Sequence, residues 1–323
     1  MPKSKYIPKI LKYQWKILWF FLITVFLLLN PSANIYFHPV DLAQGLTLSP
    51  DSDLPEPPPI PIKITDNDIP QISAEAVLIK DVPSGIVLYS KNSREIYSPA
   101  STTKIVTALV ALDYYHLDDV LTVQSDNIQG RVMGLVKKEK ITFEALLYGM
   151  LVHSANDAAY AIAENYPGGL TKFVEKMNDK VIDLGLTNTH LTNPAGFDDK
   201  NHFSTAEDLV KVSLYGLNNK LFSKIVSTKR IVVSDVTYSY FHDLINVNEL
   251  LGKIAGVAGV KTGQTENGGE ILISEVKKND TLVIIAVLKS KERFADTEKL
   301  INYIYTNYNW LPLNNLIPTI QAK

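Results

Sequence analysis

The chain has 323 residues, 46% of them apolar, which suits one large or two small globular domains and excludes a disordered protein. It contains no cysteine, which excludes disulfides, thiolate chemistry and cysteine zinc sites. The formal net charge is -2, but the only charged residues among the first thirty are five lysines, so the rest carries 27 basic against 34 acidic residues, which argues against nucleic acid as a partner.

The N-terminal segment combines those lysines with an apolar run from Ile17 to Leu29. A basic flank before a short apolar run indicates export, with the lysines held on the cytoplasmic side. The length of the run favours a cleaved signal peptide, whereas Trp15 and Trp19 at an interface would extend it into a membrane anchor. Residues 1–33 are therefore expected to form a cytoplasmic tail with either a signal or an anchor. The folded part is expected on the extracytoplasmic face of the membrane, or secreted or periplasmic if the signal is cleaved.

Residues 34–70 form the expected linker, because they lose periodicity and gain prolines, five of them between Pro55 and Pro61. Such a stretch is extended and semi-rigid, and it is predicted to lie outside any packed core. The folded domain is expected over residues 71–312, followed by a C-terminal tail over residues 313–323.

The folded domain is predicted to contain strands at both ends and helices between them. Two apolar runs, at 76–79 and 86–89, flank Asp81-Val82-Pro83-Ser84-Gly85 and predict a β-hairpin. The whole pattern favours one α/β sheet assembled from distant segments, beside a helical region. The expected helices cover residues 101–115, 142–150, 157–164, 171–184, 205–215 and 293–305, and the further strands cover 120–123, 230–233, 259–261, 271–276 and 282–288.

The first of these helices opens on a serine and a lysine three residues apart, Ser101 and Lys104. Three residues is nearly one helical turn, so both side chains share a face and come within hydrogen-bonding reach. A serine hydroxyl needs such a base, and an amine serves as one when burial or nearby cations keep it partly neutral. Backbone N–H groups at the helix start would also be available to a developing oxyanion. A second copy, Ser274 with Lys277, lies on an expected strand that places its two side chains on opposite faces.

A Ser-x-Asn pattern, Ser154 to Asn156, lies in a break between two expected helices, where side chains can point into a cleft. The same pattern occurs elsewhere, and Ser125 to Asn127 is the main competitor. That copy follows a strand signal and is typical of a solvated turn or helix cap. We therefore favour Ser154 and Asn156 as site residues.

The sequence Lys261-Thr262-Gly263 occurs once, on an expected strand. Lys261 and Thr262 suit the carboxylate end of a peptide, and Gly263 would let the peptide backbone lie alongside as an added strand. The alternative interpretation is a bulge glycine after an exposed lysine. Each short pattern alone carries little weight. The order Ser-x-x-Lys, Ser-x-Asn, Lys-Thr-Gly, with each in its expected local context, predicts a serine acyl-transfer site.

With these motifs, residues 72–312 resemble the serine-type D-alanyl-D-alanine carboxypeptidases, the low-molecular-weight penicillin-binding proteins. The resemblance extends to Asn193-Pro194-Ala195-Gly196-Phe197 and Asn246-Val247-Asn248, and Ala155 stands where the family usually has glycine. It implies an α/β (α+β), β-lactamase/transpeptidase-like fold: a mainly antiparallel sheet flanked by helices, an all-helical region, and the active site between them. It also implies removal of the terminal D-Ala from peptidoglycan stem pentapeptides without a cofactor, and acylation by β-lactam antibiotics.

In the mechanism that this resemblance implies, Ser101 attacks the carbonyl between the two D-alanines and forms an acyl-enzyme, with Lys104 as the base. Ser154 and Lys261 relay a proton to the leaving D-Ala, and Asn156 holds an amide of the acyl chain. Backbone N–H groups of Ser101 and of residue 264 form the oxyanion hole. The expected substrate-binding residues are Thr262, Gly263, Gln264 and Thr265.

Three other functions stay open. A D,D-endopeptidase of the same family would use the same residues. A class A-like β-lactamase needs a Glu-x-x-Leu-Asn loop for its deacylating water, and the region from Gly185 to Gly196 contains no Glu or Asp. A non-catalytic cell-wall-binding module would not need Ser101, Lys104 and Lys261. The sequence predicts no metal site, because the six histidines show no His-x-x-x-His spacing.

Overall fold

The structure is a computed structural model that describes residues 19–22 and 56–313. The chain separates into two compact units, Met1–Pro55 and Glu56–Lys323, and the second, called the body here, contains all the labelled strands and helices. The predicted cytoplasmic tail, the signal or anchor, most of the linker and the C-terminal tail beyond residue 313 lie outside the described residues, apart from the helical residues 19–22. Within the described residues, no helix has the length and apolar character needed to cross a membrane.

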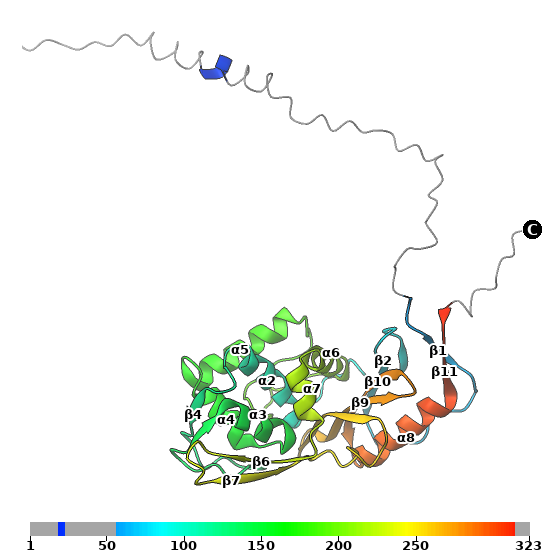
Figure 1. Cartoon of the computed structure of the whole chain (residues 1–323). Helices are drawn as coiled ribbons and strands as arrows, with labels where there is room; N and C mark the ends of the chain where they lie inside the picture. The colour runs from blue at the N-terminus through cyan, green and yellow to red at the C-terminus, as the bar shows by residue number, and fades with distance from the viewer. Residues whose placement is uncertain (1–18, 23–55, 314–323) are drawn as a thin grey trace, which may run out of the picture. The chain divides into compact units, whose positions relative to one another are not determined.

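A five-stranded antiparallel sheet forms the centre of the body, in the order β3-β2-β10-β9-β8 (Figure 1). Strand β10 pairs Ile285 with Ile79 of β2 on one side and with Ser274 of β9 on the other. The N-terminal hairpin therefore lies beside C-terminal strands, which confirms the predicted sheet of distant segments. The strands are β2 (Ala76–Asp81), β3 (Val87–Lys91), β8 (Val257–Thr265), β9 (Gly269–Lys278) and β10 (Thr281–Ser290).

Both faces of this sheet are covered, because its central strands carry apolar side chains on both sides. Ile285 of β10 belongs to a buried cluster with Leu300 of α8 (Arg293–Asn307). Its neighbour Ile284 belongs to a larger cluster, which includes residues of α6 (Ala206–Leu217) and of the helical region. Successive residues of one strand thus serve two cores.

The helical region packs beside the sheet and confirms four expected helices to within a few residues at each end, and α6 and α8 confirm the other two. The helix expected from residue 101 begins as a 3-10 turn, η1 (Ala100–Thr103), and its α-helical part ends at Leu112. The short helix α7 is not among the predicted elements. The helices of this region are α2 (Lys104–Leu112), α3 (Phe143–Val152), α4 (Asn156–Glu164), α5 (Gly169–Asp183) and α7 (Lys220–Val226).

Three two-stranded ribbons complete the body. One of them makes the body begin earlier than expected. Its first strand, β1 (Ile60–Lys63), lies in the stretch that the sequence assigns to the linker, and it pairs with β11 (Tyr308–Leu311). The pairing places Pro61 opposite Trp310 in a ribbon with no third strand, where a proline is tolerated. The other ribbons pair β4 (Val120–Thr122) with β5 (Lys140–Thr142), and β6 (Arg230–Ser234) with β7 (Phe241–Ile245).

Candidate active site

Ser101 lies in the 3-10 turn that precedes α2, at the wall of a cavity of about 340 Å³. Ala100, just before it, has a positive φ of 48°, and the Thr102 N–H donates to the Pro99 carbonyl, so the turn is tight. The cavity is bounded by β8 on one side and by loops of the helical region on the other. Its walls include Ser101, Ser154, Asn156, Thr262, Gly263, Gln264 and Thr265.

The Lys104 amine contacts three oxygens. Its Nζ lies 2.9 Å from Ser101 Oγ, 2.7 Å from Asn156 Oδ1 and 2.7 Å from the Ala195 carbonyl oxygen. The amide and carbonyl oxygens can only accept, and a neutral amine has two N–H groups to give them. The lone pair of that amine then faces the Ser101 hydroxyl, which is the arrangement that a general base requires.

Burial sets the protonation of this amine. Lys104 is completely buried, and burial lowers the pKa of its amine well below that of a surface lysine. The nearby charge of Lys261 lowers the pKa further, while Asp157 opposes it. Lys104 therefore gives up its proton far more readily than a solvated lysine.

The loop between α3 and α4 carries the second motif. Ser154 has a φ of 61°, and its buried hydroxyl accepts a hydrogen bond of 2.8 Å from Lys261 Nζ. Asn156 opens α4, and its Nδ2 donates to the Gln129 carbonyl while its Oδ1 faces Lys104. The Asn156 side chain is therefore held from two sides.

Lys261 reaches the site from β8, the edge strand of the sheet. Its amine is almost completely buried and also donates to the Thr262 carbonyl at 3.1 Å. Burial lowers the pKa of Lys261 to about 7, and the charges of Arg131 and Arg293 lower it too. A lysine with such a pKa can both give and take a proton near neutral pH.

The competing copies of the motifs lie elsewhere in the body. Ser274 is buried on β9 whereas Lys277 is exposed, so this pair lies on opposite faces as predicted. Ser125 Oγ donates to Glu164 Oε1 at 2.6 Å, outside the cavity. The structure therefore brings together the nine residues that the sequence favours and leaves out the two competing serines.

Two glycines let the segments around Ser101 approach closely. A Cβ on Gly263 would lie 3.0 Å from Ala100 Cβ and 3.2 Å from Ser101 N, so β8 passes directly beside the serine. A Cβ on Gly196, whose φ is 88°, would lie 1.8 Å from the Ala100 carbonyl oxygen. The loop of Gly196 also supplies the Ala195 carbonyl that faces Lys104. Close packing of this loop thus fixes the positions of both Ser101 and Lys104.

Gly196→Ala is expected to destabilise the body by about 3 kcal/mol and to slow acylation of Ser101, because the new methyl group must displace the turn. Chemical denaturation and the rate of labelling by a fluorescent penicillin measure the two effects. Gly134→Ala is the matched control: Gly134 has a similar φ of 87° but no atom within 4 Å of the added Cβ. It should cost only about 1 kcal/mol and leave labelling unchanged. Equal losses in both variants would contradict the proposed steric role of Gly196.

Sequence reasoning missed several groups at the cavity. Arg293 begins α8, lines the cavity and is buried, and its Nε has no hydrogen-bond partner among the described residues. Arg131 also lines the cavity, and the carbonyls of Gln129 and Ala195 hold the motif side chains. Arg293 stands at the start of an expected helix, but no local pattern indicates that its guanidinium turns toward Lys261.

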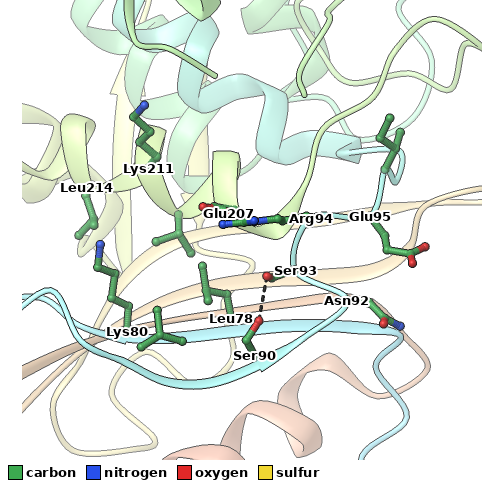
Figure 2. Close-up of a pocket in the computed structure, with 13 residues that line it drawn as sticks. Leu78, Lys80, Ser90, Asn92, Ser93, Arg94, Glu95, Glu207, Lys211 and Leu214 are labelled. Carbon is green, nitrogen blue, oxygen red and sulfur yellow. Dashed lines mark hydrogen bonds and ion pairs between the residues drawn. The ribbon is translucent and has the colours of Figure 1, made fainter. Parts of the chain in front are cut away.

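Cavity size does not mark this site. A larger cavity of about 1140 Å³ lies between β2, β3 and α6, and Figure 2 shows Leu78, Lys80 and Leu214 around it. The Arg94 guanidinium and the Glu207 carboxylate form an ion pair of 2.7 Å in the same region. This cavity contains no pairing of a nucleophile with a base, so chemistry and not volume identifies the candidate site.

No group of three or more metal-ligating side chains gathers among the described residues. His202 is buried behind the turn that carries Ser101, where its Nε2 lies 2.8 Å from Thr103 Oγ1 and its Nδ1 accepts the Thr192 N–H. Burial lowers the pKa of His202 to about 4, so it is neutral and supports the turn. This histidine therefore has a structural role.

Comparison with known proteins gives consistent similarities. Over residues 63–292 the chain matches the D-alanyl-D-alanine carboxypeptidase family, peptidase S11. It is 32% identical over 265 residues to the D-alanyl-D-alanine carboxypeptidase DacF of Bacillus subtilis, and the matched region covers 77% of this chain and 67% of that protein. It is 31% identical over 244 residues to a D-alanyl-D-alanine endopeptidase of Pseudomonas aeruginosa, and the matched region covers 73% of this chain and 78% of that protein. The crystal structure of the Streptomyces K15 DD-transpeptidase is similar with a TM-score of 0.71 and 32% identity, over 74% of this chain and 100% of that one.

Proposed function

Because this chain belongs to the D-alanyl-D-alanine carboxypeptidase family, peptidase S11, we propose that it cleaves the D-Ala-D-Ala bond of peptidoglycan stem pentapeptides with Ser101 as nucleophile. It is a serine carboxypeptidase of the penicillin-binding type, and it acts outside the cytoplasm on the cell wall. The observation that carries the residue assignment is the position of Lys104, whose buried amine has one direction left for its lone pair, toward Ser101 Oγ.

Acylation follows from this geometry. Lys104 takes the hydroxyl proton as Ser101 Oγ attacks the carbonyl carbon between the two D-alanines. The N–H groups of Ser101 and Gln264 are the proposed oxyanion donors, which is supported by the close passage of β8 beside Ser101 N. The C–N bond then breaks as this proton passes from Lys104 through Ser154 and Lys261 to the leaving amine, which leaves Lys104 neutral again.

Deacylation completes the cycle. Water attacks the ester on Ser101, Lys104 takes a proton from it, and the shortened peptide leaves with a new carboxylate while Ser101 regains its hydroxyl. Among the described residues, no Asp or Glu lines the cavity. Because a class A-like β-lactamase uses a carboxylate at this step, a β-lactam adduct should persist, and a nitrocefin assay should show little turnover.

We assign the carboxylate of the terminal D-Ala to Thr262 and Arg293. Both line the cavity, and the Arg293 Nε is a buried donor without a partner among the described residues. Arg293→Gln should therefore lower kcat/KM for a D-Ala-D-Ala peptide by about tenfold or more, because charged hydrogen bonds are the strong ones. The same peptide with a C-terminal amide is the matched substrate, and its slower hydrolysis should not change. An equal loss on both substrates would point to structural damage instead.

Acylation is expected to slow as the pH falls, because protonation of Lys104 removes the base. The charge of Lys261 lowers the pKa of Lys104, so Lys261→Met should raise that pKa. The acid limb of the pH–rate profile for acylation should then move to higher pH. The measurement is the rate of penicillin labelling between about pH 5 and 9. Lys277→Met, at an exposed lysine, should leave the limb in place. An acid limb that moves to lower pH in Lys261→Met would contradict the assignment.

The function itself is tested by incubating the protein with a pentapeptide ending in D-Ala-D-Ala and measuring the masses of the protein and of the peptide products by mass spectrometry. Release of one D-Ala and a transient ester on Ser101 are expected. Crosslinked dimeric muropeptides test the endopeptidase alternative, which relatives named as endopeptidases favour. Attachment to the membrane through the N-terminal segment is a further part of the proposal, and it rests on the lysines and apolar run of the sequence.

A further inference from the structure

The hairpin formed by β6 and β7 carries the densest group of exposed apolar side chains in the described body. Its inner face is used for packing, with Leu244 fully buried and His242 bonded to Glu139. Its outer face and tip instead expose large side chains, and Phe241 and Tyr238 are 65% and 73% exposed. Contiguous exposed apolar surface of this kind indicates a binding surface. The exposed members are Val232, Val236, Tyr238, Tyr240, Phe241 and Ile245.

The tip of the hairpin is held rigidly. The carboxylate of Asp235 accepts N–H groups from Thr237, Ser239 and Tyr240 at 2.7 to 3.0 Å. Tyr238, within this loop, has a φ of 57°, a conformation that few residues other than glycine adopt. The backbone of the tip is therefore already ordered where it exposes Tyr238, so binding there costs little backbone entropy.

The hairpin is continuous with the catalytic cavity. The Ile245 carbonyl at the end of β7 accepts from His153 Nδ1, next to Ser154, and the Val247 N–H donates to Val152. Val247 itself lines the cavity. A ligand that leaves the cavity past Val247 therefore meets the outer face of the hairpin. β1, where the described body begins, lies at the opposite end of the body (Figure 1).

We propose that this outer face binds the glycan strand to which the stem peptide is attached. Four peptide residues between sugar and scissile bond span about 14 Å when extended. The six residue steps from Val247 to Phe241 span about 20 Å when extended, so the sugars of a stem peptide that runs past Val247 along β7 fall on the hairpin. Aromatic rings offer apolar faces to sugar rings, and the Arg230–Asp243 pair on the same face, with contacts of 2.6 and 2.8 Å, offers fixed polar groups to hydroxyls. The inference rests on the proposed function and names the larger substrate of its site.

The test compares two substrates, a free stem pentapeptide and the same peptide on its disaccharide. The wild-type protein should have a kcat/KM about tenfold higher for the disaccharide form, since two ring contacts contribute roughly threefold each. The double variant Tyr238→Asn/Phe241→Thr keeps residues that suit the turn and the strand, and it should lose this advantage without losing activity on the free peptide. Tyr215→Gln, at a tyrosine on α6 that is 47% exposed, is the matched control and should keep the advantage.

A second measurement separates this inference from the proposed function. Glycan strands stripped of their stem peptides should sediment with the wild-type protein and with Ser101→Ala, and much less with the hairpin double variant. If neither peptide is hydrolysed but this binding is seen, the proposed function fails and the glycan surface stands. Equal kcat/KM for the two substrates in the wild-type protein would overturn the inference. Loss of dimerisation or of binding to anionic phospholipid vesicles in the double variant, with glycan binding unchanged, would also overturn it.

Discussion

Ser101→Ala is expected to abolish both labelling by a fluorescent penicillin and release of D-Ala from a pentapeptide, with a loss in kcat/KM of at least about 10⁴-fold. Of the three oxygens that contact the buried Lys104 amine, only the Ser101 hydroxyl can act as a nucleophile, and its removal leaves no atom to carry the acyl group. The fold should not change, because the side chain lies at the cavity wall and shrinks by one oxygen. Labelling gels and mass spectrometry measure the two outcomes.

The chain supplies its own control for this variant. Ser274 begins the second Ser-x-x-Lys, and its buried Oγ has no hydrogen-bond partner among the described residues. Ser274→Ala therefore removes the same atom without leaving a partner unsatisfied, and it should retain full labelling and full hydrolysis. Labelling that survives Ser101→Ala would end the proposed mechanism.

Lys104→Arg is expected to lower the acylation rate by at least about 10³-fold, although it keeps a long basic side chain at this position. A guanidinium does not lose its proton in a protein, so it cannot accept the proton of Ser101. Raising the pH should not restore activity. Penicillin labelling across the pH range is the measurement, and it separates a base from a group needed only for its charge.

Lys277→Arg makes the same substitution at an exposed lysine of β9 and should leave acylation unchanged. The variant Lys104→Met adds the opposite case, in which the side chain is neutral but cannot take a proton. Both substitutions at position 104 should be inactive if the residue is the base. Activity in Lys104→Arg would show that a positive charge suffices, and the assignment of the base would then be wrong.

The sequence predicted the parts of the site that local chemistry encodes. Ser101 and Lys104 are one turn apart, and Lys261 lies in a motif that occurs once, so the order of the motifs and their local context selected them. The expected hairpin, the C-terminal strands and all six expected helices also follow from short-range periodicity. These elements are confirmed by the structure within a few residues at their ends.

Groups fixed by tertiary packing could not be predicted in this way. Arg293 turns toward the cavity because α8 packs across the sheet, and the Ala195 carbonyl reaches Lys104 only because Gly196 lets its loop approach Ala100. The pairing of β1 with β11 joins segments that are about as far apart in sequence as the body allows. The proline in β1 is, by its local sequence, typical of a linker. Partners remote in sequence leave no periodic signal at either end.

The strand order has a consequence for when the enzyme becomes active. Strand β10 lies between β2 and β9, and β8 contacts the rest of the sheet through β9. The strand that carries Lys261 therefore cannot join the sheet until the last third of the chain has folded. A polypeptide still emerging from a translocation channel therefore holds its serine, but not the groups that make the serine reactive. Hydrolysis is thus delayed until the C-terminal strands have been synthesised and exported.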